Sequence, residues 1–172
     1  NEKDFTVQFW FNCKLHKGVV FSQYEKNAKN LSLHFRLRDA GSVDLGFYGN
    51  DLATKDGVVT SNAWHNLTFV MDVAAKTRTI YVDGEEKASD KPETLYVAKT
   101  GDTIIGGWNR VDKGVKKAYQ KYIGKVDEVR VWSRVLSKDE IAASMQKGSL
   151  MSAASVDSEG RLTTTWGLLK TN

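Results

Sequence analysis

Aromatic and cationic side chains gather in one stretch of the sequence, and together they could bind a sugar. Aromatic rings stack on the apolar faces of sugars, while arginine and asparagine supply directed hydrogen bonds. The segment 109–121 shows no periodicity, so we expect a long loop, a common place for a binding element. The candidate ligand-binding residues are Trp108, Asn109, Arg110, Tyr119 and Tyr122.

Four lysines in the same segment favour an acidic or sulfated glycan as the ligand: Lys113, Lys116, Lys117 and Lys121. We call the five candidate ligand-binding residues the rim. If Trp108 binds the ligand as part of the rim, its replacement by alanine should weaken binding and leave folding intact. The alternative is a solvated basic loop in which Trp108 packs against the core.

A second candidate surface is the outer face of a sheet. Five side chains have outward parity on their predicted strands: Trp10, His34, Arg36, Tyr48 and Tyr81. If these strands are neighbours, the five form one aromatic and polar strip. The alternative is that part of this face is covered by the predicted helix or by the C-terminal strand.

The acidic residues do not form the pair that glycoside hydrolysis needs. Two carboxyl groups must flank the scissile glycosidic bond. On a single strand they can do so only if both side chains point to the same face. Glu85 and Glu86 are adjacent, as are Asp127 and Glu128, and neighbours on a strand point to opposite faces. No nucleophile-elbow motif is present either. We therefore expect a binding protein and no enzyme.

Asp127 is the candidate metal ligand. It shares the parity of Val129 and Val131, which on a regular strand turns its carboxylate toward the core. A buried carboxylate needs a partner. That partner is either a cationic side chain or backbone N–H, or a Ca²⁺ ion, which takes oxygen ligands.

Length, composition and charge are those of a globular domain and argue against a membrane-spanning or nucleic-acid-binding protein. The 172 residues suffice for one domain with a two-layer core, with a formal net charge of +4 and no apolar segment long enough for a membrane span. Cys13 is the single cysteine, so no internal disulfide can form. The basic residues cluster in one segment and no nucleic-acid-binding motif accompanies them, so we expect no nucleic-acid partner.

Period-2 alternation dominates the chain and predicts many short strands, among them 4–11, 31–38, 64–72 and 124–132. Asp83-Gly84 predicts a tight hairpin turn. One helix is predicted over 138–146, with Ser137 and Glu140 as a capping box and Leu136 and Ile141 as a hydrophobic staple. This pattern predicts an all-β, antiparallel two-sheet sandwich or jelly roll with one short C-terminal helix.

Several of these segments, in order, resemble laminin-G-like domains of the concanavalin A-like lectin/glucanase superfamily. They are DFTVQFWF at 4–11, WHNLTFVMD at 64–72, TRTIYVDGEE at 77–86 and GKVDEVRVWSRVLSKDEI at 124–141. The resemblance implies a concanavalin A-like sandwich and a structural Ca²⁺ near Asp127. It also implies a strand before 4–11, a place that the β-type segment 161–169 could fill.

The resemblance also directs the functional prediction. We expect residues 1–172 to form one sandwich domain excised from a larger secreted or surface protein, acting as a non-catalytic carbohydrate-binding module. The alternative is a structural or protein–protein interaction domain without a sugar site.

Overall fold

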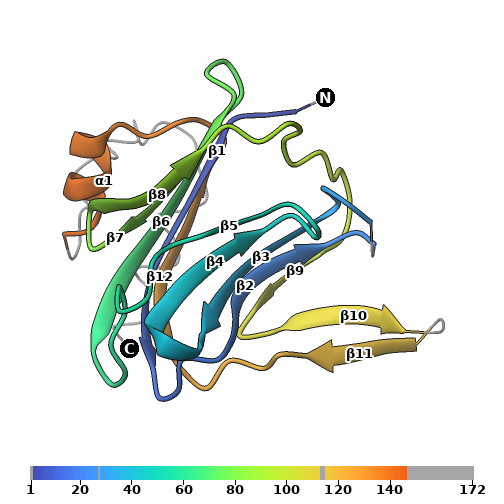
Figure 1. Ribbon diagram of the computed structural model, residues 1–172, viewed down its shortest axis with the longest axis horizontal. Helices are drawn as coiled ribbons and strands as arrows, with labels where there is room; N and C mark the ends of the chain where they lie inside the picture. Colours follow the sequence, from blue (N-terminus) through green and yellow to red (C-terminus); the bar gives the residue numbers. More distant parts are fainter. Residues whose placement is uncertain (1, 27, 113–114, 147–172) are drawn as a thin grey trace, which may run out of the picture.

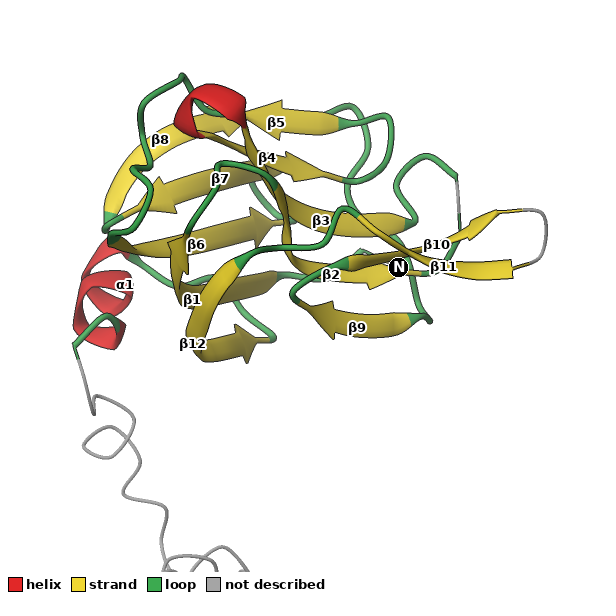
Figure 2. Cartoon of the chain, turned by 90° about the horizontal axis from the view of Figure 1, so that it is seen from below, coloured by secondary structure: helices red, strands yellow, loops and turns green. Residues whose placement is uncertain are grey.

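The computed structural model describes residues 2–26, 28–112 and 115–146, with the backbone alone for 109–112 and 115–119. Within this part, the chain forms two antiparallel five-stranded sheets packed face to face, with one short helix (Figures 1 and 2). The predicted all-β sandwich is confirmed. The predicted strand 161–169 lies outside the described residues, and the assignment of residues 1–172 to one domain stays a prediction. The described residues form no helix that is both long and apolar enough to cross a membrane.

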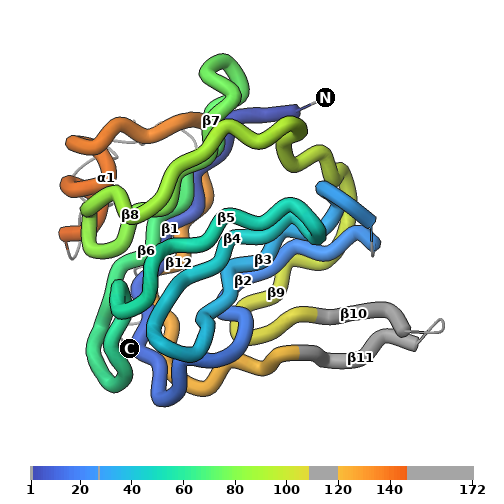
Figure 3. The backbone as a smooth tube through the Cα atoms, in the orientation of Figure 1, coloured from blue at the N-terminus to red at the C-terminus, as the bar shows by residue number. Residues whose placement is uncertain are grey.

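The first sheet has the strand order β12-β1-β6-β7-β8. Its strands are β1 (Phe5–Cys13), β6 (Trp64–Asp72), β7 (Thr77–Val82), β8 (Glu85–Asp90) and β12 (Gly124–Trp132). The second sheet has the order β5-β4-β3-β2-β9. Its strands are β2 (Gly18–Tyr24), β3 (Ser32–Arg38), β4 (Ser42–Gly46), β5 (Asp51–Ala53) and β9 (Asp102–Ile105), with the 3₁₀ turn η1 (Asp39–Gly41) before β4. Residues 91–101 carry the chain between the sheets past its N-terminal end (Figure 3).

The core follows from the alternation that the sequence displays. Phe9 of β1 lies across the sandwich from β2 and β3, with its ring 5.6 Å from that of Phe35 at 82° and 6.4 Å from that of Phe21. Phe35 also meets Phe69 of β6 edge-on at 5.8 Å. Such edge-to-face contacts add to the stability gained by burying the rings. Because Phe35 faces inward, its neighbours His34 and Arg36 must face outward.

The segment predicted as a long loop is instead a hairpin. Strands β10 (Trp108–Asp112) and β11 (Val115–Tyr119) pair in register, with Trp108 opposite Tyr119. This hairpin forms its own two-stranded sheet and projects beside β2 and β9 (Figure 1). The prediction was wrong because the sequence of this segment lacks the period-2 alternation from which strands are predicted.

A β-bulge in β12 overturns the predicted orientation of Asp127. The pairing with β1 passes from Gln8–Arg130 to Trp10–Asp127, so Phe9 faces two residues of β12. Glu128 is the extra residue at the bulge, and its backbone is in the left-handed region, with a φ of 51°. Val129 still packs against the core, but Asp127 is exposed. The core-facing position predicted for Asp127 is therefore wrong.

Helix α1 (Lys138–Ser144) covers the outer face of the first sheet. The predicted capping box is confirmed: Ser137 accepts the N–H of Glu140, and Glu140 accepts the N–H of Ser137 at 2.8 Å. Leu136 and Ile141 are buried against Val70 and Tyr81. Arg130, outward on β12, is buried beneath the helix and donates to the carbonyl of Ser144.

The capping box gives a pH-dependent contribution to stability. The hydrogen bond from Arg134, at 2.8 Å, and that from the Ser137 N–H lower the pKa of Glu140 to about 2. A group whose pKa is depressed on folding stabilises the protein above its unfolded pKa, and this is lost as the pH falls through the folded pKa. Glu140→Gln should therefore lower the melting temperature at pH 7, and the difference from wild type should shrink between pH 5 and pH 2. A difference independent of pH would contradict an ionic role for Glu140.

Candidate functional site

The outer face of the second sheet carries a buried carboxylate held by two arginines. Asp44 of β4 lies opposite Arg36 of β3 and has only 1% of its surface exposed. Its Oδ2 atom accepts hydrogen bonds from Nε and Nη2 of Arg36, with the Nε at 3.0 Å. The same oxygen accepts from Nε of Arg38 at 3.1 Å and from Nη2 at 2.8 Å. One carboxylate thus fixes two guanidinium groups side by side.

Both guanidinium groups remain accessible. The Arg36 side chain is 21% exposed and the Arg38 side chain 50% exposed. The structure gives the Nη1 atoms of these two arginines no hydrogen-bond partner among the described residues. Asp51 stands at the margin, with its Oδ2 atom 3.9 Å from Nη2 of Arg36. The two cations and Asp44 carry a net charge of +1, and their outward N–H groups can donate to an anionic or hydroxyl-bearing ligand.

An aromatic wall stands beside this charged group. The Trp108 indole lies flat on the His34 imidazole, with ring centroids 4.8 Å apart and planes 13° from parallel. Tyr24 and Tyr48 meet the same indole edge-on at 6.5 and 6.3 Å. Burial lowers the pKa of His34, so its imidazole is neutral at pH 7. The hairpin is anchored below the wall by Ser22, whose hydroxyl donates to the carbonyl of Gly107 at 2.9 Å.

A shallow hollow of about 410 Å³ opens beside the two arginines. It lies between the end of β3 and the turn before β2, and Arg36, Arg38, His16 and Lys17 line it together with Asp39 and Asp56. A volume of this size lies within the range of small-molecule sites. The hollow, the arginine pair and the aromatic wall together form what we call the arginine face, defined by Arg36, Arg38, Asp44, Tyr48 and Trp108.

The structure separates the members of the predicted rim. Trp108 is 6% exposed and packed on the sheet, which matches the alternative in which it is buried, so Trp108→Ala is expected to destabilise the domain. Tyr122 packs against the core instead, and its hydroxyl donates to the carbonyl of Lys125 at 3.1 Å. Burial raises the pKa of Tyr122. Asn109, Arg110 and Tyr119 lie on β10 and β11, and their side chains are outside the described residues. A ligand-binding role for these five residues stays a prediction.

The predicted outer strip divides between the two sheets. His34 and Arg36 lie on β3 and Tyr48 follows β4, whereas Trp10 and Tyr81 lie on β1 and β7 of the other sheet. Tyr81 is moreover buried under α1. Sequence reasoning missed Asp44 and Arg38 as members of the site. The signal was available, because both have the outward parity of Arg36.

The metal prediction loses its geometric basis and stays untested as a prediction. Asp127 is exposed, and its Oδ1 atom accepts the N–H of Glu128 at 2.8 Å. Among the described residues, His34, Asp44 and Asp51 bring three potential ligand atoms within 4.8 Å of one another. However, Arg36 and Arg38 already form ion pairs with the Asp44 carboxylate, and their positive charges would repel a cation there. The residues of this cluster therefore fit a metal poorly.

Gly46 is required for the stack of His34 and Trp108. A Cβ atom on Gly46 would overlap the imidazole of His34. We expect Gly46→Ala to cost about 1–3 kcal/mol of unfolding free energy, as overpacking does, and to change the tryptophan fluorescence by displacing Trp108. Chemical denaturation followed by fluorescence measures both. Gly107→Ala is the matched control, because a Cβ atom there meets open space. Equal stability of the two variants would contradict this account of Gly46.

The calcium prediction can be tested by thermal unfolding. If Asp127 binds Ca²⁺ in the folded protein but not in the unfolded chain, added Ca²⁺ must raise the melting temperature. Asp127→Asn must then reduce this increase. The matched control is Asp39→Asn, a change of an exposed acid elsewhere. A melting temperature that changes neither with added calcium nor with a chelator would contradict calcium binding by the folded protein.

Comparison with known proteins agrees with this architecture. The family model described as concanavalin A-like lectin/glucanases superfamily matches residues 1–142. No curated protein matches the chain in sequence. Among solved structures, the CBM40 of the Ruminococcus gnavus IT-sialidase, bound to α2,3-sialyllactose, is similar with a TM-score of 0.70 and 18% identity, covering 84% of this chain and 83% of that one.

Two further structures share the fold over a smaller part of their own length. The NanB sialidase of Streptococcus pneumoniae gives a TM-score of 0.69 and 22% identity, covering 83% of this chain and 24% of that one. A putative carbohydrate-binding protein of Bacteroides ovatus gives 0.64 and 21%, covering 81% and 40%. Such identities establish a shared fold alone. The match of the family model over most of the sequence, together with the sandwich, places this chain in the concanavalin A-like lectin/glucanase superfamily.

Proposed function

We propose that this domain is a non-catalytic carbohydrate-binding module and that the arginine face binds an acidic glycan. The observation that carries the proposal is the pair of guanidinium groups, Arg36 and Arg38, fixed by the buried Asp44 beside a hollow. Arginine forms paired hydrogen bonds with carboxylates, and here its orientation is set before the ligand arrives.

The surroundings suit a sugar. Tyr48, partly exposed beside Trp108, offers an aromatic ring, and Asp51 offers a carboxylate that can accept hydrogen bonds from sugar hydroxyl groups. The solved structure with sialyllactose bound has the same fold and contains an acidic sugar, which supports the choice of glycan class. A module that binds such glycans meets them outside the cell, so we also propose a secreted or surface location. The parent protein could use it to hold a separate activity near its substrate.

The test compares one acidic and one neutral glycan. Titration calorimetry of the full chain should show binding of α2,3-sialyllactose and much weaker binding of lactose. Arg38→Gln should weaken sialyllactose binding roughly tenfold or more, as expected for a hydrogen bond to a charged group. Arg38 is the better target because Arg36 then remains to pair with Asp44, and the fold is retained.

Two controls make the outcome specific. Arg134→Gln removes an exposed arginine next to α1, on the other sheet, and should leave the affinity unchanged. Lys116→Gln combined with Lys117→Gln tests the predicted hairpin site. If this double variant loses binding and Arg38→Gln does not, the arginine face is wrong and the hairpin is the site. If acidic and neutral glycans all fail to bind, a protein-interaction domain is the better description.

A further inference from the structure

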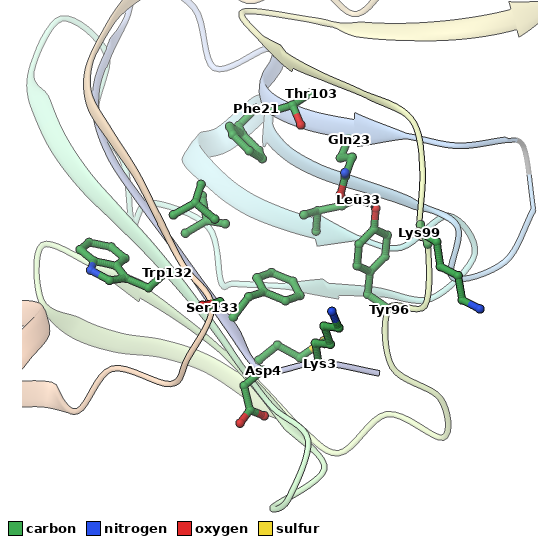
Figure 4. A pocket seen from close by; sticks show the side chains of 15 residues that line it. Lys3, Asp4, Phe21, Gln23, Leu33, Tyr96, Lys99, Thr103, Trp132 and Ser133 are labelled. Atoms are coloured by element: carbon green, nitrogen blue, oxygen red, sulfur yellow. Dashed lines mark hydrogen bonds between the residues drawn. The ribbon is translucent and has the colours of Figure 1, made fainter. Parts of the chain in front are cut away.

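The tryptophans of the first sheet lie on its outer face. The inner face borders a groove of about 860 Å³ between the two sheets, whose lining includes Leu33 and Tyr96 (Figure 4). Figure 4 shows the ring of Trp132 turned away from these two side chains, and it packs against the buried cluster under α1. Trp10 of β1 also points outward, because its neighbours on both sides belong to the core.

Helix α1 covers only one half of this outer face. It packs over Val70 and Tyr81, and the hydroxyl of Ser144 donates to Oε1 of Gln8 on β1 at 2.9 Å. The next outward residue of β1 after Gln8 is Trp10, which is half-buried. The other half of the face therefore begins at Trp10.

Six outward side chains form two rows across the three neighbouring strands of that half. Each row takes one residue from β12, one from β1 and one from β6, and the three lie opposite one another in the sheet. The first row is Asp127, Trp10 and Asn66, and the second row is Lys125, Asn12 and Trp64. We call these six residues the tryptophan platform.

The two tryptophans of the platform are placed to contact one ligand. They are diagonal neighbours, since Trp10 lies opposite Asn66 and Trp64 precedes Asn66 by two residues. Diagonal neighbours on antiparallel strands are about 7–8 Å apart, within the reach of aromatic side chains. Trp64 is 45% exposed, whereas the other tryptophans in the described part of the chain are buried or half-buried. A large exposed aromatic surface of this kind is typical of a binding site.

The backbone beside Trp64 is held in place by hydrogen bonds. Nε2 of His65 accepts the N–H of Thr60 at 3.0 Å, so Nδ1 carries the proton and donates to Oδ2 of Asp83 at 2.7 Å. Oδ1 of Asp83 accepts the N–H of Asn66 at 2.8 Å. The start of β6 is thus fixed before a ligand arrives, and such preorganisation lowers the entropic cost of binding.

Asn66 carries an unpaired donor at the base of the platform. The residue is 1% exposed, and its Oδ1 atom accepts the hydroxyl of Thr68 at 3.1 Å. Its Nδ2 atom has no hydrogen-bond partner among the described residues. Buried amide groups normally have one. A ligand hydroxyl, or a water that bridges to it, would satisfy this N–H.

We propose that the tryptophan platform is a second glycan-binding site and that it binds a neutral, extended glycan, a β-linked glucan chain. Tryptophan rings stack on the apolar faces of sugars, and the glucose ring has such faces because its hydroxyl groups are equatorial. The side chains of Asn12 and Asp127 can form hydrogen bonds with those hydroxyl groups. Strands of a sheet lie about 4.8 Å apart, so three strands give a platform roughly 10 Å wide, longer than one sugar ring.

Charge and position separate this site from the arginine face. Lys125 and Asp127 carry opposite charges, so the platform does not favour an anion. The arginine face lies on the outer side of the second sheet, and the platform lies on the outer side of the first. A protein partner fits the platform less well, because a stable protein–protein interface takes about 20–30 residues from each side.

Titration calorimetry of the full chain with cellohexaose tests the proposal. A chelator is present throughout, so that calcium at Asp127 does not contribute. The wild-type protein should bind cellohexaose, and Trp64→Ala should weaken binding roughly tenfold or more, as expected when a central aromatic contact is removed. Ile105→Ala is the matched control: it removes an exposed apolar side chain from the second sheet and should leave the affinity unchanged.

Sialyllactose binding is measured on the same variants. Trp64→Ala should not alter it, because the proposed acidic-glycan site is on the other sheet. Loss of cellohexaose binding alone therefore concerns the platform, and loss of sialyllactose binding alone concerns the arginine face.

Nuclear magnetic resonance gives a second readout that leaves the chain unaltered. On addition of cellohexaose, the indole N–H signals of Trp10 and Trp64 should shift, and those of Trp108 and Trp132 should keep their positions.

Each other outcome overturns the proposal. A wild-type protein that does not bind cellohexaose has no such site, and binding that survives Trp64→Ala takes place elsewhere. An equal loss in Ile105→Ala means that the effect is not specific to the platform. Self-association without glycan that Trp64→Ala abolishes means that a second copy of the chain occupies this face.

Discussion

The contact between the aromatic side chains of the two sheets governs the rest of this structure. Phe9 from the first sheet packs against both Phe21 and Phe35 from the second, which also contact each other, and Phe69 of the first sheet meets Phe35 as well. Side chains on a strand alternate, so fixing Phe35 inward also fixes His34 and Arg36 outward. A slip of one residue would bury a histidine and an arginine in the core and expose Phe35 and Leu37. The orientation of the arginine face is therefore enforced by the hydrophobic core beneath it.

The buried charge of Asp44 imposes a second constraint on that face. A carboxylate that is 1% exposed is stable only with partners, and the structure provides two guanidinium groups. Arg36 lies directly opposite Asp44, and Arg38 follows two residues later with the same parity. Asp51 lies near Arg36 as a second carboxylate, at 3.9 Å, so the arrangement that stabilises Asp44 leaves chiefly the half-exposed Arg38 guanidinium fixed at the surface. The three side chains that stabilise this part of the sheet are thus the same three to which we assign the proposed binding role.

Sequence patterns predicted those features that depend on local repetition. Alternation identified the principal strands, and Ser137 with Glu140 identified the start of the helix. Patterns failed where long-range pairing decided the outcome. The bulge at Glu128 reversed Asp127 because its cause is the register between β12 and β1, which a single strand does not display. The strip that includes Trp10 and Tyr81 failed for a related reason, since parity gives the face of a strand but not the sheet to which it belongs. The hairpin of β10 and β11 was missed because its sequence shows no period-2 alternation of apolar residues.

The two surfaces that the sequence suggested as rivals meet at Trp108. This residue belongs to the hairpin, yet its ring rests on His34 of the sheet face. The basic hairpin and the arginine pair therefore border one region of the surface, but they would contribute to anion binding in different ways. Exposed lysines act mainly through long-range attraction, which salt screens over about 8 Å at physiological ionic strength. In the proposed site, Arg36 and Arg38 would act through directed hydrogen bonds at contact distance, where screening is weak. A ligand held mainly by the arginine pair should thus retain its affinity as salt increases, whereas one held by the hairpin lysines should not, so the salt dependence of binding separates the two contributions.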